Sequence, residues 1–336
     1  MAIERTPLLS VQDLVVEFST EHGVVRAIDR VSFDVYPNET IGIVGESGCG
    51  KTVTGLSVLG LIPSPPGRIV AGRILFQGRD LAKLAESELR DIRGRDIAMI
   101  FQEPMTALNP VFTIGNQMTD VLMIHRGLTR RQARAAAIDM LAKVDIPVPG
   151  TRIDEYPHQL SGGMRQRVMI AMALSCGPKL LIADEPTTAL DVTTQAQVLE
   201  QINKLQREFQ MSVILITHDL GVVAETCRRV IVMYCGRVVE NAAIENLFRR
   251  PLHPYTAGLL DSIPRIREHR LAELPVIPGR VPSLLNLPAG CRFAERCRKV
   301  GERCRRESPA LEMFGDTGDY VACHTPGMQS GEVADA

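Results

Sequence analysis

Residues 45–52 read Gly45-Glu46-Ser47-Gly48-Cys49-Gly50-Lys51-Thr52, and they directly follow the apolar run 41–44. This pattern, between a predicted buried strand and a predicted helix, is the glycine-rich P-loop. In such a loop the glycines let backbone amides surround phosphate oxygens, the lysine reaches the terminal phosphates, and the threonine hydroxyl binds magnesium. A purely structural glycine turn is the alternative, but the complete motif in this position predicts a nucleotide-phosphate site that uses Mg2+.

Short apolar runs alternate with longer amphipathic segments on both sides of this loop. The alternation predicts an α/β fold in which crossover helices connect the strands of a parallel sheet. Residues 31–36 instead alternate apolar with polar side chains, which predicts a half-exposed antiparallel strand. The expected buried strands are 41–44, 180–183 and 213–217, and the expected helices are 129–144 and 192–209.

An acidic motif supplies a second part of the phosphate site. The segment 180–185 reads Leu-Leu-Ile-Ala-Asp-Glu, so an apolar strand ends in Asp184 and Glu185. Asp184 is placed to hold the magnesium shell, and Glu185 to orient or deprotonate the attacking water. Paired acids often mark an ordinary strand end, but two carboxylates at the exit of so apolar a strand favour a catalytic role.

A third motif precedes a long apolar helix, where residues 160–164 read Leu-Ser-Gly-Gly-Met. Ser161 is placed as the N-cap, and Gly162 and Gly163 allow the backbone to approach a ligand closely. An ordinary capped helix would explain Ser161 but would not need two glycines, each of which costs backbone entropy. One nucleotide does not need two phosphate-binding segments on one chain, so residues 160–164 are expected to bind the nucleotide of a neighbouring chain.

With these three motifs the sequence resembles the ATP-binding cassette (ABC) family of ATPases, over nearly the whole chain up to the proline-rich run 274–290. Residues 45–52 resemble its Walker A motif, 160–164 its signature, and 180–185 its Walker B motif with Glu185 as the catalytic glutamate. The resemblance implies roles for further residues: Asp191 in a D-loop (189–191), His218 as the switch histidine, Gln102 as the Q-loop glutamine that also meets magnesium, and Phe18 beneath adenine.

The family resemblance also implies a fold and a mechanism. The fold is a P-loop ATPase cassette, here residues 1–250, with an antiparallel β subdomain and a helical subdomain at about 103–178. Two cassettes dimerise head to tail, so each ATP lies between one chain's P-loop and the other's signature helix. The alternatives are a soluble ABC-type ATPase that acts on nucleic acid or ribosomes, and a metal-binding regulator with a degenerate cassette. One P-loop, the intact Lys51 and Glu185 and a net charge of −1 disfavour both.

Two further segments resemble the ATPases of dipeptide and oligopeptide importers: Pro251–Leu260 and Tyr156–Gln159. This implies a second cassette, expected to be a paralogue, two membrane-spanning permease subunits and an extracytoplasmic peptide-binding protein, with no nucleic-acid partner. Gln102 and the segment 104–120 would meet the membrane-spanning partner. Because the chain has no apolar run of about eighteen residues, we expect peripheral attachment at the cytoplasmic face of the inner membrane.

Four of the eight cysteines crowd the C-terminal end: Cys291, Cys297, Cys304 and Cys323. In a cytosolic chain such thiols suit an iron–sulfur cluster, here [4Fe-4S], or a structural zinc. Zinc sites usually pair cysteines two to four residues apart, so these wider gaps favour the cluster. Basic side chains between 292 and 306 could surround it, or form a solvated face: Arg292, Arg296, Arg298, Lys299, Arg303, Arg305 and Arg306.

The remaining sequence sets the expected boundaries and one hypothesis about reactivity. Residues 251–324 are expected to form the cysteine-containing extension, the prolines of 274–290 an extended connector, and 325–336 a disordered tail. Cys49, Cys176, Cys227 and Cys235 are interpreted as small buried hydrophobic residues. Cys49 lies beside a helix N-terminus, which can lower a thiol pKa, so oxidative inhibition through Cys49 is a hypothesis.

Overall fold

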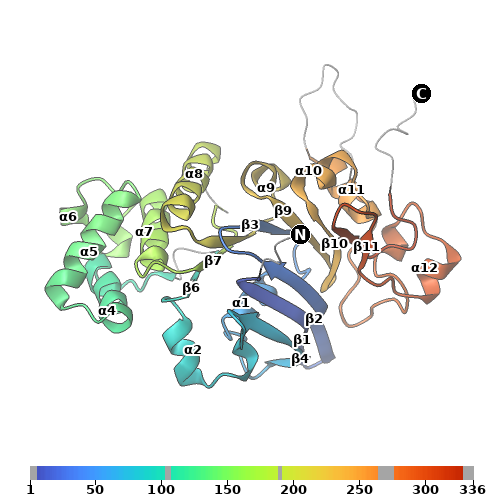
Figure 1. The fold of residues 1–336 in the computed structure, drawn as a ribbon, viewed down its shortest axis with the longest axis horizontal. Helices are drawn as coiled ribbons and strands as arrows, with labels where there is room; N and C mark the ends of the chain where they lie inside the picture. Colours follow the sequence, from blue (N-terminus) through green and yellow to red (C-terminus); the bar gives the residue numbers. More distant parts are fainter. Residues whose placement is uncertain (1–5, 103–106, 188–190, 264–275, 328–336) are drawn as a thin grey trace, which may run out of the picture. The chain divides into compact units, whose positions relative to one another are not determined.

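The computed structural model describes residues 6–102, 107–187, 191–263 and 276–327, and the described chain forms two compact units (Figure 1). Each unit is discontinuous in sequence. Of the described residues, the first unit contains 6–8, 35–39 and those of 83–216, and the second contains 9–34, 40–82 and those from 217 onward. The P-loop therefore belongs to the second unit, whereas the acidic motif and the signature belong to the first.

The second unit contains an antiparallel sheet, of which β1, β2 and β4 are labelled in Figure 1. In β1, Phe18 lies opposite Gly67, and in β2 the residues Val31, Phe33 and Val35 are buried while the two between them are partly exposed. The predicted alternation at 31–36 is therefore confirmed, although the strand begins earlier, at Gly23. The strands are β1 (Leu9–Thr20), β2 (Gly23–Val35), β4 (Gly67–Phe76) and β5 (Arg79–Asp80), in the order β2-β1-β4-β5.

A second sheet in the same unit runs from the strand before the P-loop into the cysteine-rich region. β3 pairs with β9 in parallel, and the pairings from β9 through β10 and β12 to β11 are antiparallel. The C-terminal extension thus contributes two strands to the sheet that carries the P-loop. The strands are β3 (Thr40–Val44), β9 (Arg229–Tyr234), β10 (Arg237–Ala243), β11 (Glu312–Phe314) and β12 (Asp319–Val321).

Short helices complete the second unit. α1 begins directly at the P-loop lysine, and α9 contacts β3. The buried carboxylate of Glu240 accepts hydrogen bonds from the amides of Leu252 and His253, at 2.8 and 2.9 Å, and so holds the chain that enters α11. The helices are α1 (Lys51–Val58), α9 (Leu220–Thr226), α10 (Ile244–Arg249), α11 (Pro254–Asp261) and α12 (Glu302–Arg306), with short 3-10 turns at Leu81–Lys83 and Ala294–Arg296.

The first unit contains three parallel strands whose residues are all buried, β6 beside β7 and β7 beside β8. Its helices α4, α5 and α7 pack on one another and form the group at one end of this unit in Figure 1. The elements are β6 (Ile97–Ile100), β7 (Leu180–Asp184), β8 (Ser212–Ile216), α2 (Glu86–Ile92), α4 (Ile114–Arg126), α5 (Arg130–Lys143), α6 (Pro149–Arg152), a 3-10 turn (Pro157–Gln159), α7 (Gly162–Leu174) and α8 (Val192–Phe209).

Most of the predicted elements are confirmed. The three predicted strands match β3, β7 and β8 within a residue at each end, and the predicted helices match α5 and α8. Residues 276–290 contain neither helix nor strand, as expected of a proline-rich connector. Residues 103–106, 188–190, 274–275 and 328–336, on which parts of the predicted helical subdomain, D-loop, connector and tail fall, lie outside the described residues. None of the described helices is long and apolar enough to cross a membrane.

A buried carboxylate ties the extension to the antiparallel sheet. Asp29 of β2 is 3% exposed and accepts hydrogen bonds from Arg237 (Nε, 2.8 Å), Arg292 and Arg26 (Nη1, 3.4 Å). Burial alone would raise the pKa of Asp29, but Arg237 and the other two guanidinium groups outweigh it and hold the pKa below its ordinary value. The charge of Asp29 is therefore retained inside the unit.

The substitution Asp29→Ala should lower the free energy of unfolding by about 2 kcal/mol or more, because it removes a buried carboxylate and leaves the partly buried Arg237 and Arg292 without it. The stabilisation by Asp29 is present above the ordinary aspartate pKa of 3.8 and is lost as the pH falls through its lowered folded-state pKa. Urea denaturation at neutral and acidic pH should therefore show that the difference in unfolding free energy between wild type and variant is smaller in acid. Asp154→Ala, which breaks an exposed pair with Arg134, is the control, and an equal loss there would contradict the assignment.

Candidate nucleotide-binding site

The glycines of the P-loop have backbone conformations that side chains disfavour. Gly45, Gly48 and Gly50 have φ angles of 151°, 78° and 107°. A Cβ atom at Gly45 would lie 2.2 Å from the carbonyl oxygen of Met233 on β9, so no other residue fits there without moving the strand. Ser47 and Gly48 are exposed at the tip of the loop, where their amides can meet a ligand.

Lys51 lies inside the loop that it serves. Its ammonium group donates hydrogen bonds to the carbonyl oxygens of Gly45 (2.8 Å) and Glu46 (3.2 Å), and the residue is 6% exposed. Thr52 is exposed at the start of α1, and Thr54 donates to the carbonyl of Gly50 at 3.0 Å. The loop thus curls around the ammonium group of Lys51, which places this cation beside the loop amides that phosphate oxygens would meet.

The hypothesis of a reactive Cys49 is wrong. Cys49 is 2% exposed, and burial raises the pKa of its thiol above the ordinary value, although Lys51 acts in the opposite direction. Desolvation therefore outweighs the helix N-terminus on which the hypothesis rested. Cys227 and Cys235 are buried as predicted, whereas Cys176 is only half-buried.

The acidic motif places a buried and a partly buried carboxylate next to each other at the end of β7. Asp184, at the end of β7, is 2% exposed, and Glu185 follows it with a left-handed φ of 45°. The amide of Glu185 donates to the carbonyl of Ile216 at 2.8 Å, and the side-chain amide of Gln102 donates to Glu185 Oε2 at 3.1 Å. A strained backbone at a non-glycine residue is characteristic of functional positions, and here it turns Glu185 toward Gln102.

The signature begins a helix whose first amides face solvent. Ser161 is the N-cap of α7 and accepts a hydrogen bond from the amide of Met164 at 3.3 Å, as predicted. Ser161 and Gly162 are exposed, and a Cβ at Gly162 would meet nothing within 4 Å. Gln166, buried one turn later, donates to the carbonyl of Pro186 and so connects this helix to the chain just after Glu185.

The structure places three further predicted site residues at a helix cap, in a loop and on a strand: Asp191, His218 and Phe18. Asp191 caps α8, accepting from the amide and hydroxyl of Thr194 at 3.0 and 2.7 Å, and the amide hydrogen bond lowers the pKa of Asp191. His218 is exposed between β8 and α9, next to the N-cap Asp219. Phe18 is half-buried on β1. Asp191 and the acidic motif belong to one unit, His218 and Phe18 to the unit that carries the P-loop.

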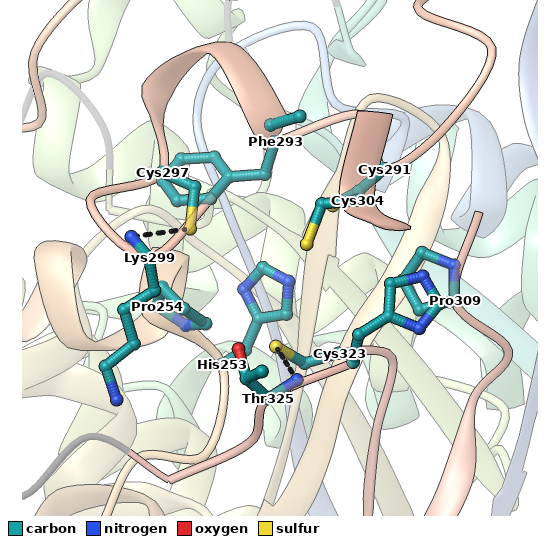
Figure 2. Close-up of a pocket in the computed structure, with 12 residues that line it drawn as sticks. His253, Pro254, Cys291, Phe293, Cys297, Lys299, Cys304, Pro309, Cys323 and Thr325 are labelled. Carbon is teal, nitrogen blue, oxygen red and sulfur yellow. Dashed lines mark hydrogen bonds between the residues drawn. The ribbon is translucent and has the colours of Figure 1, made fainter. Parts of the chain in front are cut away.

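The four C-terminal cysteines line one pocket together with His253, Phe293 and Lys299 (Figure 2). Backbone amides donate to two of the sulfurs, Lys299 to Cys297 and Thr325 to Cys323, each at 3.4 Å. Burial, with smaller effects from the neighbouring thiols, raises the pKa of Cys291 to about 11. Among the described residues, no three His, Cys, Asp or Glu side chains are arranged to hold a single metal ion.

The expected basic shell around these cysteines is only partly present. Arg292 binds Asp29, Arg296 binds Glu46, Arg303 binds Glu307 and Arg306 binds Glu302. Lys299 lines the pocket. Carboxylates, and not the cysteines, are therefore the main partners of these arginines. The sequence between 292 and 306 could not indicate this, because two of the carboxylates lie far away in the chain.

The fold and the site define a P-loop nucleotide-binding protein with an acidic motif after a buried strand and a second, glycine-led helix terminus. Family profiles match two regions: "ABC transporter" matches residues 28–188, and "Oligopeptide/dipeptide transporter, C-terminal region" matches 239–304. The oligopeptide transport ATP-binding protein AppD of Bacillus subtilis is 53% identical over 316 residues, which are 94% of this chain and 96% of that protein. The chain therefore belongs to the ATP-binding proteins of the ABC transporter family.

Two further similarities agree with this membership. The dipeptide transport ATP-binding protein DppD of Escherichia coli is 49% identical over 319 residues, covering 95% of this chain and 97% of that protein. A solved dimeric ATP-binding cassette in a post-hydrolysis state with ADP and Pi is 26% identical, with a TM-score of 0.63 over 70% of this chain and 98% of that chain. The predicted ABC ATPase fold is thus confirmed.

Sequence reasoning missed three residues that hold the site. Gln166 is a polar residue in an apolar helix, a signal that could have been noticed. Tyr255 lies in the predicted importer-type segment 251–260, but nothing there indicated its contact with the P-loop, where its hydroxyl accepts a hydrogen bond from the amide of Glu46 at 2.8 Å. Arg296 was assigned to the cysteines but binds the carboxylate of Glu46 in the P-loop.

The substitution Glu185→Gln should reduce the ATP turnover number by about 100-fold or more, because the amide cannot accept the proton of the attacking water. ATP binding should change little, since the P-loop is intact. Phosphate release and equilibrium ATP binding measure the two effects. Glu200→Gln, an exposed acid on α8, is the control, and an equal loss of turnover there, or full activity of Glu185→Gln, would remove Glu185 from the catalytic role.

Proposed function

We propose that the chain is the ATP-hydrolysing subunit of a membrane importer for dipeptides or oligopeptides. The observation that carries the proposal is that one chain joins the P-loop and signature to a C-terminal region of the oligopeptide/dipeptide transporter type. The relatives named for dipeptide and oligopeptide transport match along nearly their whole length, which supports the same substrate class here. In this proposal, residues 1–250 are the cassette and 251–324 the extension.

The residue roles follow from the chemistry of the site. The P-loop amides and Lys51 bind the phosphates, and the ring of Phe18 lies beneath adenine. Thr52, Asp184 and Gln102 would hold Mg2+, which neutralises charge on the phosphates when bound. Glu185 takes a proton from water, with Gln102 orienting its carboxylate at 3.1 Å. His218 donates to the terminal phosphate.

The partner cassette, proposed to be a paralogue, would complete each site. Ser161, Gly162 and Gly163 would bind the nucleotide held by the partner's P-loop, and Asp191 would lie at the same junction. The exposed start of α7 supports this role, because its amides are open to a ligand from outside the chain. ATP binding would then close the two chains, and hydrolysis would reopen them.

The membrane-spanning permease subunits would dock on the helical part of the first unit. Just before α4, Val111 and Phe112 are 70% and 50% exposed, and Ile124 on the same helix is 76% exposed. These exposed apolar side chains lie before the start of α4 and near its end, and large apolar side chains of this kind are common in protein interfaces. In this proposal the chain attaches peripherally at the cytoplasmic face of the inner membrane, and a separate extracytoplasmic protein supplies the peptide.

Uptake of a labelled dipeptide and of a labelled oligopeptide tests the proposal in cells whose own copy of the chain has been deleted. Uptake of at least one peptide should fall to background, return with the wild-type chain and fail to return with Glu185→Gln. Uptake of a labelled amino acid is the control. Unchanged uptake of both peptides would instead support the soluble ATPase that acts on nucleic acid or ribosomes.

We also propose that Cys291, Cys297, Cys304 and Cys323 hold a [4Fe-4S] cluster. Four thiols around one pocket are a donor set that such clusters use, and the amides that donate to Cys297 and Cys323 are the kind of hydrogen bond that stabilises thiolate ligands. Buried neighbouring thiols resist ionisation on their own, so a cationic group in the pocket would favour their thiolate forms.

Anaerobically purified protein should therefore contain iron and sulfide in equal amounts, about four of each per chain. Cys297→Ser should lose most of both, whereas Cys176→Ser, at a half-buried cysteine outside the pocket, should keep them. Elemental analysis with a visible absorption spectrum measures the result. Zinc in place of iron would support the structural-zinc alternative, and the absence of both metals would overturn the proposed site.

A further inference from the structure

Two residues of the C-terminal region hold the P-loop at Glu46. Arg296 donates to both carboxylate oxygens of Glu46, Nη1 to Oε2 at 2.6 Å and Nη2 to Oε1 at 2.9 Å. The hydroxyl of Tyr255 accepts a hydrogen bond from the backbone amide of Glu46 at 2.8 Å. The P-loop is therefore fixed both at its backbone and at its side chain by residues from α11 and from the cysteine-rich segment.

Contacts other than the one with Glu46 also fix the side chain of Arg296. Its side chain is 4% exposed, and its Nε donates to the carbonyl of Pro278 at 3.0 Å. The guanidinium also lies 5.8 Å from the ring centre of Tyr234 and 5.9 Å from that of Phe293. A buried, stacked and bidentate arginine loses little further freedom on binding a carboxylate, so the pair with Glu46 is preorganised.

Tyr255 is fixed in the same way. Its ring is fully buried and packs against Tyr234 and Phe293, with centroid distances of 4.7 and 5.4 Å. Its backbone amide donates to Nδ1 of His253 at 3.0 Å, and burial holds the pKa of His253 well below its ordinary value, so this ring is neutral and can accept. The packed aromatic cluster thus holds the hydroxyl of Tyr255 next to the P-loop.

The charge of Glu46 explains why this contact matters for the nucleotide. Glu46 is a carboxylate inside a loop whose purpose is to bind polyanionic phosphates, and its side chain is 29% exposed. An unpaired negative charge there would repel the nucleotide, and it would also compete for Lys51, which already donates to the carbonyl of Glu46. Arg296 neutralises that charge without occupying the phosphate-binding amides.

We propose that Arg296 and Tyr255 are positioning residues of the ATP site, through which the C-terminal extension keeps the P-loop in its binding conformation. Both residues contact Phe293, which lines the cysteine pocket, and Arg296 directly precedes Cys297 in the chain. The extension therefore takes part in nucleotide binding. This inference concerns ATP binding alone and does not depend on the transported substrate or on the metal.

The test is equilibrium binding of Mg-ATP to the full chain, together with the KM and turnover number for ATP. Arg296→Met should weaken ATP binding by about tenfold, and Tyr255→Phe by about threefold, in line with a charged and a neutral hydrogen bond. Turnover at saturating ATP should stay within about twofold to threefold of wild type. Arg306→Met, which removes an exposed pair with Glu302, is the matched control and should leave binding unchanged.

A second pair of variants separates positioning from general stability. Glu46→Gln combined with Arg296→Met should bind ATP more tightly than Arg296→Met alone, because the repelling carboxylate is gone. Arg296→Lys should fall between wild type and Arg296→Met, since it keeps the charge but loses the two-pronged contact. If Arg296→Met does not fold, Arg296→Lys and Tyr255→Phe decide the question by the same titration.

The proposal is overturned if folded variants bind ATP as tightly as wild type. It is also overturned if their only defect is a lower turnover number with an unchanged KM, which a smaller folded fraction would produce. Thermal unfolding of each variant identifies that case. A loss of peptide uptake with normal ATP binding would count against the positioning role while leaving the importer assignment intact.

Discussion

The close approach of the P-loop to β9 is the constraint on which the rest of the structure depends. Gly45 lies so near the carbonyl of Met233 that a single added carbon atom would overlap it. The loop can take this path only because β3 and β9 pair in parallel directly before it. The next residue on β9 is Tyr234, whose ring begins the aromatic cluster that reaches the cysteine pocket. The nucleotide loop, the sheet and the extension are therefore parts of one packed arrangement.

Three buried or partly buried carboxylates of the second unit each have specific partners. Asp29 is matched by guanidinium groups, and Glu46 by Arg296. Glu240 accepts two backbone amides at the entry to α11, although burial still raises its pKa. Each of these contacts joins segments that are distant in sequence, so the polar groups specify how the C-terminal chain is placed on the sheet.

The sequence predicted the parts of this protein that are local. The P-loop, the strand that ends in Asp184 and the capped start of α7 each occupy a few adjacent residues, and the pattern within each segment determines its conformation. The gathering of four cysteines was also predictable, because their number and type are unusual in so short a stretch. For Cys49 the sequence left two possibilities open, a buried hydrophobic residue or a reactive thiol, and the fold decides between them because burial raises the pKa of the thiol.

The contacts that the sequence could not predict are long-range. Arg296 follows Glu46 by 250 positions, and an arginine in a basic segment gives no indication of which carboxylate it binds. The left-handed backbone of Glu185 likewise depends on the neighbouring strand β8, whose last residue accepts its amide hydrogen bond. Such features arise from tertiary packing, and a pattern of residue types along the chain does not contain them.

The pairing of Glu46 with Arg296 has a consequence for how such chains evolve. An acidic residue at this place in the loop is tolerable only while an arginine elsewhere in the gene product neutralises it, so a change at either position favours a compensating change at the other. Cassettes that lack the extension are under no such restriction. The identity of one P-loop residue should therefore covary, across related genes, with the presence of a domain encoded some 250 codons downstream.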